Sequence, residues 1–189
     1  QGYYSQHGQD KWVVEEFFPR REHGIFVDIG AYDGVSLSNT YYLEKLGWTG
    51  LAIEPIPAVY NKLARNRSCI TINGCIADQQ GRMRFRAISG YAEMLSGLID
   101  EYDKRHLRRA QREIEKYGGS YEDIEVACYN LNDLLDEHKI SSIDYLSIDV
   151  EGAELRILES IDFARTVVSV IGVENNYNDV AIPELLISR

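Results

Sequence analysis

The stretch Val27-Asp28-Ile29-Gly30-Ala31-Tyr32-Asp33-Gly34 decides how this 189-residue sequence is interpreted. It overlaps the compact apolar run Ile25 to Ile29, which predicts a buried strand broken by a glycine. A helical segment follows from Ser38 to Leu46, and Gly47 can end it in the left-handed conformation. The stretch is therefore the turn of a strand-turn-helix unit. The free N–H groups at the start of the helix favour a phosphate or a carboxylate.

Two glycines and one acid in this turn narrow the class of ligand. Asp28, Gly30 and Gly34 form the pattern acid-x-Gly-x-x-x-Gly, in which glycine allows the backbone to approach a ligand closely. A dinucleotide-binding GxGxxG motif starting at Gly30 would also need glycine where Tyr32 and Val35 stand. A pyrophosphate therefore has poor access, and the turn favours a monoadenosyl ligand such as S-adenosylmethionine. A tight turn without a ligand is the alternative.

The rest of the chain alternates short apolar runs with helical segments, which is the pattern of a parallel α/β sheet. Further strands are expected at 50–54, 69–77, 125–129, 141–150 and 167–173, and helices at 57–66 and 153–160. Residues 82–87 alternate charged and apolar side chains and predict a small hairpin extension. We expect one Rossmann-like domain over residues 1–189, with a mostly parallel sheet, flanking helices and a mostly helical insertion at about 90–121.

Composition argues against several classes of protein. The formal net charge of −10 opposes binding to nucleic acid. No apolar run approaches the ~20 residues that cross a bilayer. The three cysteines, Cys69, Cys75 and Cys128, form no CxxC motif, and an odd number cannot all pair within one chain. These features predict a soluble protein of a reducing compartment, the cytoplasm.

Two more carboxylates stand at the ends of predicted strands. Glu54 ends the second strand, twenty residues beyond Gly34, where an acid can accept hydrogen bonds from both hydroxyls of a ribose. Asp78 ends the third predicted strand. It either meets the amino group of an adenine or caps the turn that follows.

Three acids follow the predicted strand at 141–150. Glu154 lies in the first turn of the next helix, where it stabilises the helix dipole. Asp149 and Glu151 precede the helix proper. They are candidates for a general base or for oxygen ligands of a divalent cation such as Mg²⁺.

The insertion concentrates positive charge in an acidic protein. Six Lys or Arg residues, together with His106, lie between Lys104 and Lys116. One helical stripe of apolar character runs along the segment: Tyr102, Leu107, Ala110, Ile114 and Tyr117. The pairs Glu101–Arg105 and Arg109–Glu113 are spaced as on a solvated helix surface. The alternative is a lid whose basic face receives an anionic acceptor.

Five ordered segments resemble the FkbM-like methyltransferases. They are Ser5-Gln6-His7-Gly8-Gln9-Asp10, Asp28 to Gly34, Ile53-Glu54-Pro55, Ile148-Asp149-Val150-Glu151-Gly152 and Val173-Glu174-Asn175-Asn176. The resemblance implies a class I methyltransferase fold, S-adenosylmethionine as the methyl donor, and a hydroxyl acceptor on a sugar, a polysaccharide or a natural product such as a polyketide. Members of the family usually continue with a helix and a β-hairpin, whereas residues 176–189 have room for one short helix. The sheet is therefore expected to lack that hairpin.

The resemblance also implies which residues bind the cofactor. It places Asp28, Gly30 and Gly34 around the methionine part and Glu54 at the ribose. The further expected contacts are Gln6, Asp10, Tyr32, Ser38, Pro55 and Asp78. At the tip of the last strand, Glu174 and Asn175 either face the acceptor or cap the sheet.

The sequence predicts methyl transfer from a sulfonium to an acceptor oxygen, with positioning of donor and acceptor supplying most of the rate. Asp149, Glu151 and His7 are the candidates for deprotonating or orienting the hydroxyl. A divalent cation held by Asp149 and Glu151 would instead lower the pKa of the hydroxyl. Two other functions stay open. One is an NAD(P)-dependent oxidoreductase, which the missing glycines disfavour, and the other is a non-catalytic module that binds the cofactor without turnover.

Overall fold

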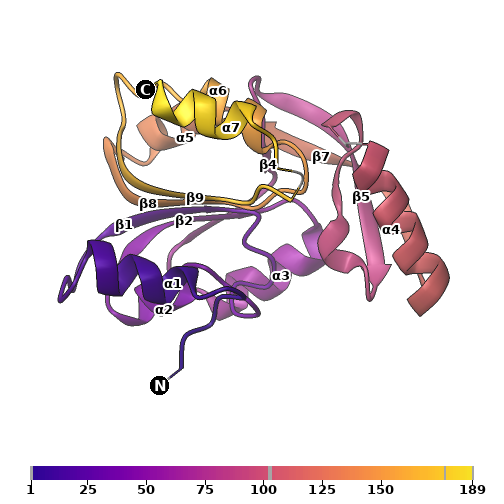
Figure 1. Ribbon diagram of the computed structural model, residues 1–189, viewed down its shortest axis with the longest axis horizontal. Helices are drawn as coiled ribbons and strands as arrows, with labels where there is room; N and C mark the ends of the chain where they lie inside the picture. The colour runs from indigo at the N-terminus through magenta and orange to yellow at the C-terminus, as the bar shows by residue number, and fades with distance from the viewer. Residues whose placement is uncertain (1, 102–103, 177, 189) are drawn as a thin grey trace.

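Five parallel strands form the central sheet of the computed structural model, which describes residues 2–101, 104–176 and 178–188 (Figure 1). In spatial order they are β3 (Ile70–Asn73), β2 (Thr49–Glu54), β1 (Ile25–Ile29), β8 (Ser142–Ile148) and β9 (Val167–Val173). Each neighbouring pair is parallel. The predicted α/β fold with a mostly parallel sheet is confirmed. The strand order reverses between β1 and β8, which is where open α/β sheets bind ligands.

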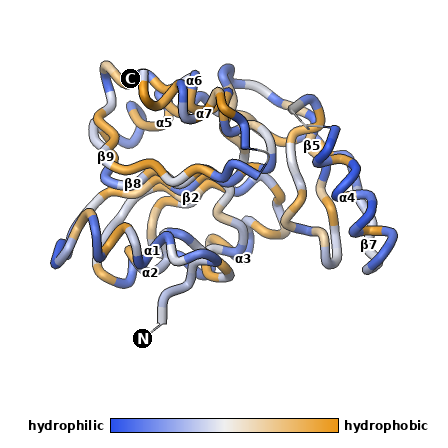
Figure 2. Tube along the Cα trace, in the orientation of Figure 1, coloured by the Kyte–Doolittle hydropathy of each residue, from blue (hydrophilic) through white to orange (hydrophobic). Residues whose placement is uncertain are grey.

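Helices cover both faces of this sheet. One face carries α1 (Gln9–Trp12), α2 (Tyr41–Lys45) and α3 (Pro57–Asn66), and the other carries α5 (Leu131–Glu137), α6 (Glu154–Ser160) and α7 (Ala181–Ile187) (Figure 1). Because both faces are covered, the central strands are apolar along most of their length, as Figure 2 shows for β8 and β9. Phe26, Leu51 and Leu146 have no exposed surface.

Several helices differ from the sequence prediction in extent. α2 begins at Tyr41 and not at Ser38, because the Ser38 hydroxyl oxygen accepts the Tyr41 N–H at 3.1 Å and caps the helix from outside. α3 has the predicted bounds. α1 and α5 were not predicted, since four and seven residues are too few for a helical period to stand out. After β9 the described residues contain α7, the one short helix expected, and no further strand.

The predicted strand at 69–77 is two strands in two sheets. The strand is interrupted at Gly74, whose N–H donates to the Glu54 carbonyl at 3.1 Å. A Cβ on Gly74 would lie 2.7 Å from the carbonyl oxygen of Ala127, so only glycine lets these two segments approach. β3 ends in the central sheet, and β4 (Cys75–Ile76) continues in a second one.

The second sheet contains β4, β7 (Gly119–Tyr129), β5 (Gly81–Gly90) and β6 (Gly97–Leu98), in that order. β5 pairs antiparallel with β7, from Gly81 opposite Cys128 to Gly90 opposite Gly119. The strand predicted at 82–87 therefore pairs with β7, on the other side of the insertion. β7 begins at Gly119, earlier than the strand predicted at 125–129. Between β5 and β7 the chain forms a short 3-10 turn, Glu93–Leu95, and the helix α4 (Lys104–Tyr117).

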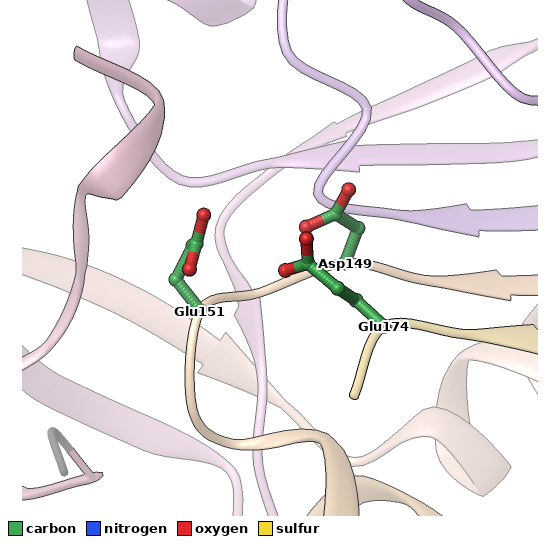
Figure 3. A group of neighbouring side chains, drawn as sticks. All are labelled: Asp149, Glu151 and Glu174. Carbon is green, nitrogen blue, oxygen red and sulfur yellow. The ribbon is translucent and has the colours of Figure 1, made fainter. Parts of the chain in front are cut away.

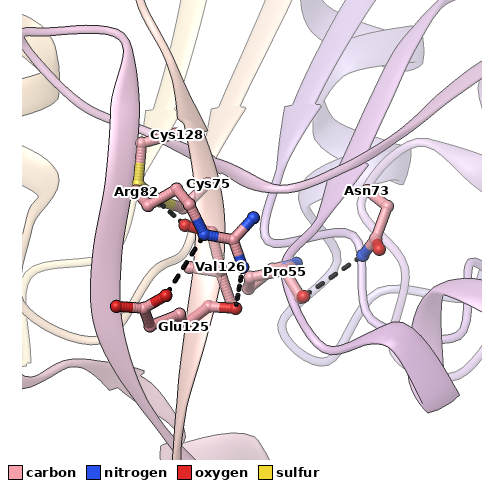
Figure 4. The surroundings of a disulfide bond; sticks show 7 residues. All are labelled: Pro55, Asn73, Cys75, Arg82, Glu125, Val126 and Cys128. Atoms are coloured by element: carbon pink, nitrogen blue, oxygen red, sulfur yellow. Dashed lines mark hydrogen bonds and ion pairs between the residues drawn. A yellow bond between two sulfur atoms is a disulfide. The ribbon is translucent and has the colours of Figure 1, made fainter.

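Two of the three cysteines form a disulfide that no sequence motif indicated. Cys75 on β4 and Cys128 on β7 are direct neighbours in the second sheet and are bonded (Figure 4). The pairing depends on β4 leaving the central sheet, which sequence spacing does not reveal. Cys69 is the remaining free thiol. The odd number of cysteines and the missing CxxC motif were the grounds for expecting a reducing compartment, and the Cys75–Cys128 bond weakens that inference.

None of the helices in the described ranges is long and apolar enough to cross a bilayer.

Candidate active site

The turn after β1 is held in place by the protein itself. Gly30 and Gly34 both have left-handed backbones, with φ of +87° and +83°. A Cβ on Gly30 would collide with the carbonyl oxygen of Asp149, and a Cβ on Gly34 would lie 2.7 Å from the Leu63 side chain. The structure thus gives a further reason for glycine at both positions, because the end of β8 and α3 occupy the space that a Cβ would need.

A buried arginine supports this turn from below. Arg67, whose side chain has no exposed surface, donates to the Gly34 carbonyl at 3.2 Å, the Thr40 hydroxyl at 3.0 Å and the Glu44 carboxylate at 2.7 Å. Thr40 in turn donates to the Asp28 carboxylate. Burial raises the pKa of Asp28, and the positive charge of Arg67 opposes this rise. Asp28 is thus part of the hydrogen-bond network that holds the turn. It does not line the cavity that lies at the carboxyl ends of the central strands.

A cavity of about 270 Å³ lies at the carboxyl ends of the central strands. The strand ends contribute Gly30, Tyr32, Glu54, Pro55, Cys75, Asp149, Glu151 and Glu174 to its lining, and the N-terminal segment and the insertion contribute Gln6, His7, Glu93, Met94, Leu95 and Arg109. Among the described lining residues five are acids, and Arg109 is the one with a permanent positive charge. The cavity is therefore strongly acidic.

Glu54 occupies the end of β2 in this cavity, as predicted. Its carboxylate accepts the Tyr32 N–H at 3.1 Å and the Ile56 N–H at 2.9 Å. Burial raises the pKa of Glu54 to about 7, against the effect of these two hydrogen bonds. The Tyr32 hydroxyl donates to Glu93 at 2.8 Å. Glu93 comes from the insertion and was not singled out from the sequence, since no local pattern marks it.

Three carboxylates meet on the other side of the cavity. Asp149 follows β8, Glu174 follows β9, and Glu151 lies in the loop after β8 (Figure 3). One oxygen from each lies within 4.8 Å of the others, which is close enough to share one divalent cation. Burial raises the pKa of Glu151 to about 8, and the charge of Glu174 adds to this. The same two causes strongly raise the pKa of Asp149.

Glu174 is the member of this cluster that sequence reasoning left undecided. Its Oε2 is buried without a hydrogen-bond partner in the described structure. The neighbouring Asn175 caps the following loop instead, because its side chain accepts the Asp179 N–H at 2.7 Å. Glu154 holds the loop before α6 by accepting the N–H groups of Val150 and Gly152, at 3.2 Å and 3.0 Å.

Glu151 is held by residues from two other segments. The Nδ1 of His106, on α4, lies 3.3 Å from Glu151 Oε2. The Asn176 amide donates to the same oxygen at 3.4 Å. His106 was grouped with the basic surface of the insertion, whereas the structure buries it completely.

Besides Asp28 and Gly34, three predicted cofactor residues lie outside the cavity. Asp10 is fully buried and accepts N–H bonds from Tyr4 at 2.7 Å and Lys11 at 2.8 Å, so it organises the N-terminal segment. Ser38 caps α2. Asp78 is half exposed and pairs with Arg156 of α6 at 3.1 Å, because the chain leaves the central sheet at Gly74 and Asp78 follows β4 of the second sheet. Gln6 and His7 do reach the cavity.

The basic face of α4 points mainly to solvent. Arg108 and Arg112 are exposed on this hydrophilic helix (Figure 2), and Arg109 reaches the cavity. The predicted Arg109–Glu113 pair forms at 3.2 Å. In the predicted apolar stripe Ala110 is buried, while Tyr117 is 51% exposed. Tyr102 and the side chain of Glu101 lie outside the described residues. The alternative prediction was a lid whose basic face covers the cavity and receives an anionic acceptor. The structure does not place such a face over the cavity, since the basic side chains of α4 point mainly to solvent.

Comparisons with known proteins address the family. Residues 28–186 match the family described as the Methyltransferase FkbM domain. The chain is 25% identical to 31-O-demethyl-FK506 methyltransferase FkbM of Streptomyces tacrolimicus, over 83% of this chain and 70% of the relative. It is 30% identical to Methyltransferase 1 of Beauveria bassiana, over 76% of this chain and 61% of the relative. It is 28% identical to Methyltransferase sdnD of Sordaria araneosa, over 73% of this chain and 60% of the relative.

The chain thus spans less than two thirds of the length of the last two relatives. No solved structure matches it. The family match covers most of the sequence and includes every strand of the central sheet except the start of β1. The chain belongs to the FkbM methyltransferase family.

Proposed function

We propose that this protein transfers the methyl group of S-adenosylmethionine to a hydroxyl oxygen of a small-molecule acceptor. The observation that carries the proposal is the acidic cavity beside the glycine turn, with Glu54 at the end of β2. S-adenosylmethionine carries a sulfonium and an ammonium against one carboxylate. The net positive charge of this cofactor favours the ionised forms of the acidic lining residues, whereas the pyrophosphate of NAD(P)H would oppose their ionisation.

The residues of the turn and of β2 fit an adenosyl ligand. The N–H groups of Tyr32 and Ile56 fix the Glu54 carboxylate, and Glu54 lines the cavity at the strand end where a ribose would present its hydroxyls. Pro55 and Cys75 add apolar surface beside it. In this arrangement Tyr32, Glu54 and Pro55 bind the cofactor, while Asp28, Gly34 and Ser38 act through the support of the turn.

The acceptor side is assigned to the cluster of Asp149, Glu151 and Glu174. S-adenosylmethionine, when bound, supplies a methyl group on a positively charged sulfur. A positive charge beside Glu151 stabilises its ionised form, which a general base needs. We assign proton removal to Glu151, with Asp149 orienting the hydroxyl and His7 at the cavity wall. The acids argue for a neutral or cationic acceptor and against an anionic one.

One relative supports the choice of oxygen as the methylated atom. Its name, 31-O-demethyl-FK506 methyltransferase, describes an O-methylation of a natural product. We therefore propose a hydroxyl of a sugar or a natural product for this chain as well. A divalent cation on the three carboxylates is the second route to an activated hydroxyl, because their oxygens lie within reach of one ion.

Calorimetric titration tests the cofactor. S-adenosylmethionine and S-adenosylhomocysteine should bind, NADH should not, and Glu54→Ala should weaken binding about 10- to 100-fold, as for lost hydrogen bonds to a charged group. Glu159→Ala on the exposed face of α6 is the matched control. Binding of NADH together with silence of the other two ligands would overturn the proposal.

A second assay separates an enzyme from a binding module. Transfer of labelled methyl from S-adenosylmethionine is measured with a panel of sugars and polyketide alcohols, in EDTA and in Mg²⁺. Transfer in EDTA supports the base route, and transfer that requires Mg²⁺ supports the cation route. Cofactor binding without product from any panel member would favour the non-catalytic module.

A further inference from the structure

His106 is the one residue of the insertion whose side chain is both fully buried and in contact with the acid cluster among the described residues. Its two ring nitrogens face different partners. Nε2 lies 2.9 Å from the carbonyl oxygen of Leu95, which belongs to the 3-10 turn of the insertion. Nδ1 lies 3.3 Å from Glu151 Oε2. The ring therefore links the insertion to the loop after β8.

The chemistry of the two partners fixes the arrangement of protons. A carbonyl oxygen only accepts, so the hydrogen on Nε2 points at Leu95. Nδ1 then faces a carboxyl oxygen, and a lone pair there would be repelled by an ionised carboxylate. One hydrogen therefore lies between Nδ1 and Oε2, carried by either the imidazole or the carboxyl group. The Oε2 of Glu151 is therefore occupied by its contact with His106. The Asn176 amide donates to the same atom and strengthens this arrangement.

The backbone of Glu151 is held by a separate device. Glu151 has a left-handed φ of +59°, which costs a non-glycine residue of order 1 kcal/mol and persists only when surrounding contacts maintain it. Glu154 supplies these contacts by accepting the N–H groups of Val150 and Gly152 on either side. The backbone is thus held from α6 and the carboxyl group from α4. Such double support is typical of a side chain whose orientation matters.

We propose that His106 is a positioning residue for Glu151, and this rests on the proposed function of Glu151 as the acid that takes the proton of the acceptor. His106 holds Oε2, so that Oε1 faces the acceptor hydroxyl. As the new O–CH₃ bond forms and the S–CH₃ bond breaks, the hydroxyl proton passes to Oε1. S-adenosylhomocysteine leaves, and the His106–Glu151 pair carries one proton more than before, which solvent removes.

The contact itself is tested by NMR on the full chain with ¹⁵N-labelled histidine. The chain has only four histidines, so the ring signals can be assigned by single substitutions. Glu151→Gln should shift the Nδ1 signal of His106 and leave those of His7, His23 and His138 in place. An unchanged His106 spectrum would overturn the proposal.

Two substitutions of His106 test the positioning role, because one keeps the contact with Glu151 and the other keeps the contact with Leu95. The amide of His106→Asn can replace Nδ1 toward Glu151, and the amide of His106→Gln can replace Nε2 toward Leu95. With the acceptor panel described above, we expect His106→Asn to stay near the wild-type kcat and His106→Gln to lose about 100-fold, as for a misplaced catalytic group. The KM for S-adenosylmethionine should be unchanged in both, and His138→Gln is the matched control.

The reverse order of the two variants, or equal losses, would show that His106 only packs the insertion and would overturn the proposal. A wild-type protein that binds no S-adenosylmethionine, with the NMR shift present, would count against the proposed function and not against the His106–Glu151 contact.

Discussion

Replacing Glu174 by glutamine should stabilise the protein at alkaline pH and leave its stability nearly unchanged at acidic pH. Glu174 contributes one of three carboxylates whose oxygens lie within 4.8 Å of one another, and its Oε2 has no hydrogen-bond partner in the described structure. Its charge is the second cause, after burial, of the raised pKa of both Asp149 and Glu151. Glutamine keeps the shape of the side chain and removes this charge.

The size of the effect follows from the spacing. Two unit charges 4.8 Å apart interact by about 3 kcal/mol at an effective dielectric constant of about 20. The pKa of Asp149 and Glu151 is raised in the folded state, so the stability they contribute is present at low pH and is lost as the pH rises through the folded pKa. At pH 5 both acids hold their protons, and Glu174 has no charged neighbour in the cluster. At pH 9 Glu151, with a pKa of about 8, is mainly ionised.

Urea unfolding at pH 5 and pH 9, in EDTA, measures the difference. Glu174→Gln should gain about 3 kcal/mol over the wild type at pH 9 and less than about 1 kcal/mol at pH 5. Glu184→Gln, at an exposed site on α7, is the matched control and should change neither value. An equal gain at both pH values, or a loss at pH 9, would refute the argument that charge repulsion within the cluster raises these pKa values.

Two further substitutions and one reduction experiment probe the support of the fold. Gly34→Ala should cost about 2 to 4 kcal/mol in urea unfolding, from the left-handed backbone and the tight packing on α3, and a cost below about 1 kcal/mol would contradict this. Arg67→Leu should cost about 3 kcal/mol, because it leaves the partly buried Glu44 carboxylate without its charged partner, and adding Glu44→Gln should recover part of the loss. Reductant should lower the free energy of unfolding by about 4 kcal/mol, since the Cys75–Cys128 bond closes a loop over a separation of 53 residues, while Cys128→Ala protein should not respond to reductant.

The predictable part of this protein is the part encoded locally. The apolar run before Gly30, the glycine turn and the helix from Pro57 all follow from residues that are neighbours in the chain. Repetition of that unit predicted the parallel sheet. Glu54 was placed correctly for the same reason, since it directly ends an apolar strand and parallel strands end at one edge of the sheet.

Tertiary structure decided which polar residues the site contains. Asp78 failed to reach the cavity because Gly74 transfers the chain to a second sheet, and that transfer depends on how closely β7 approaches. The same event brought Cys75 and Cys128 together. Asp28 was drawn into the network of Arg67, an interaction between the first strand and the end of α3.

Glu93 and His106 show the reverse case. Each lacks a local pattern that separates it from a surface residue, and each enters the site because distant segments pack against the loop after β8 or against the glycine turn. Glu174 ends an apolar strand as Glu54 does, and only the packing of β8 beside β9 brings it to Asp149 and Glu151. Sequence by itself therefore determined the sheet, the turn and the position of Glu54 at the sheet edge, since short-range periodicity and backbone freedom encode them. The partners of Glu151 depend on contacts between segments far apart in the chain, and only the folded structure decided them.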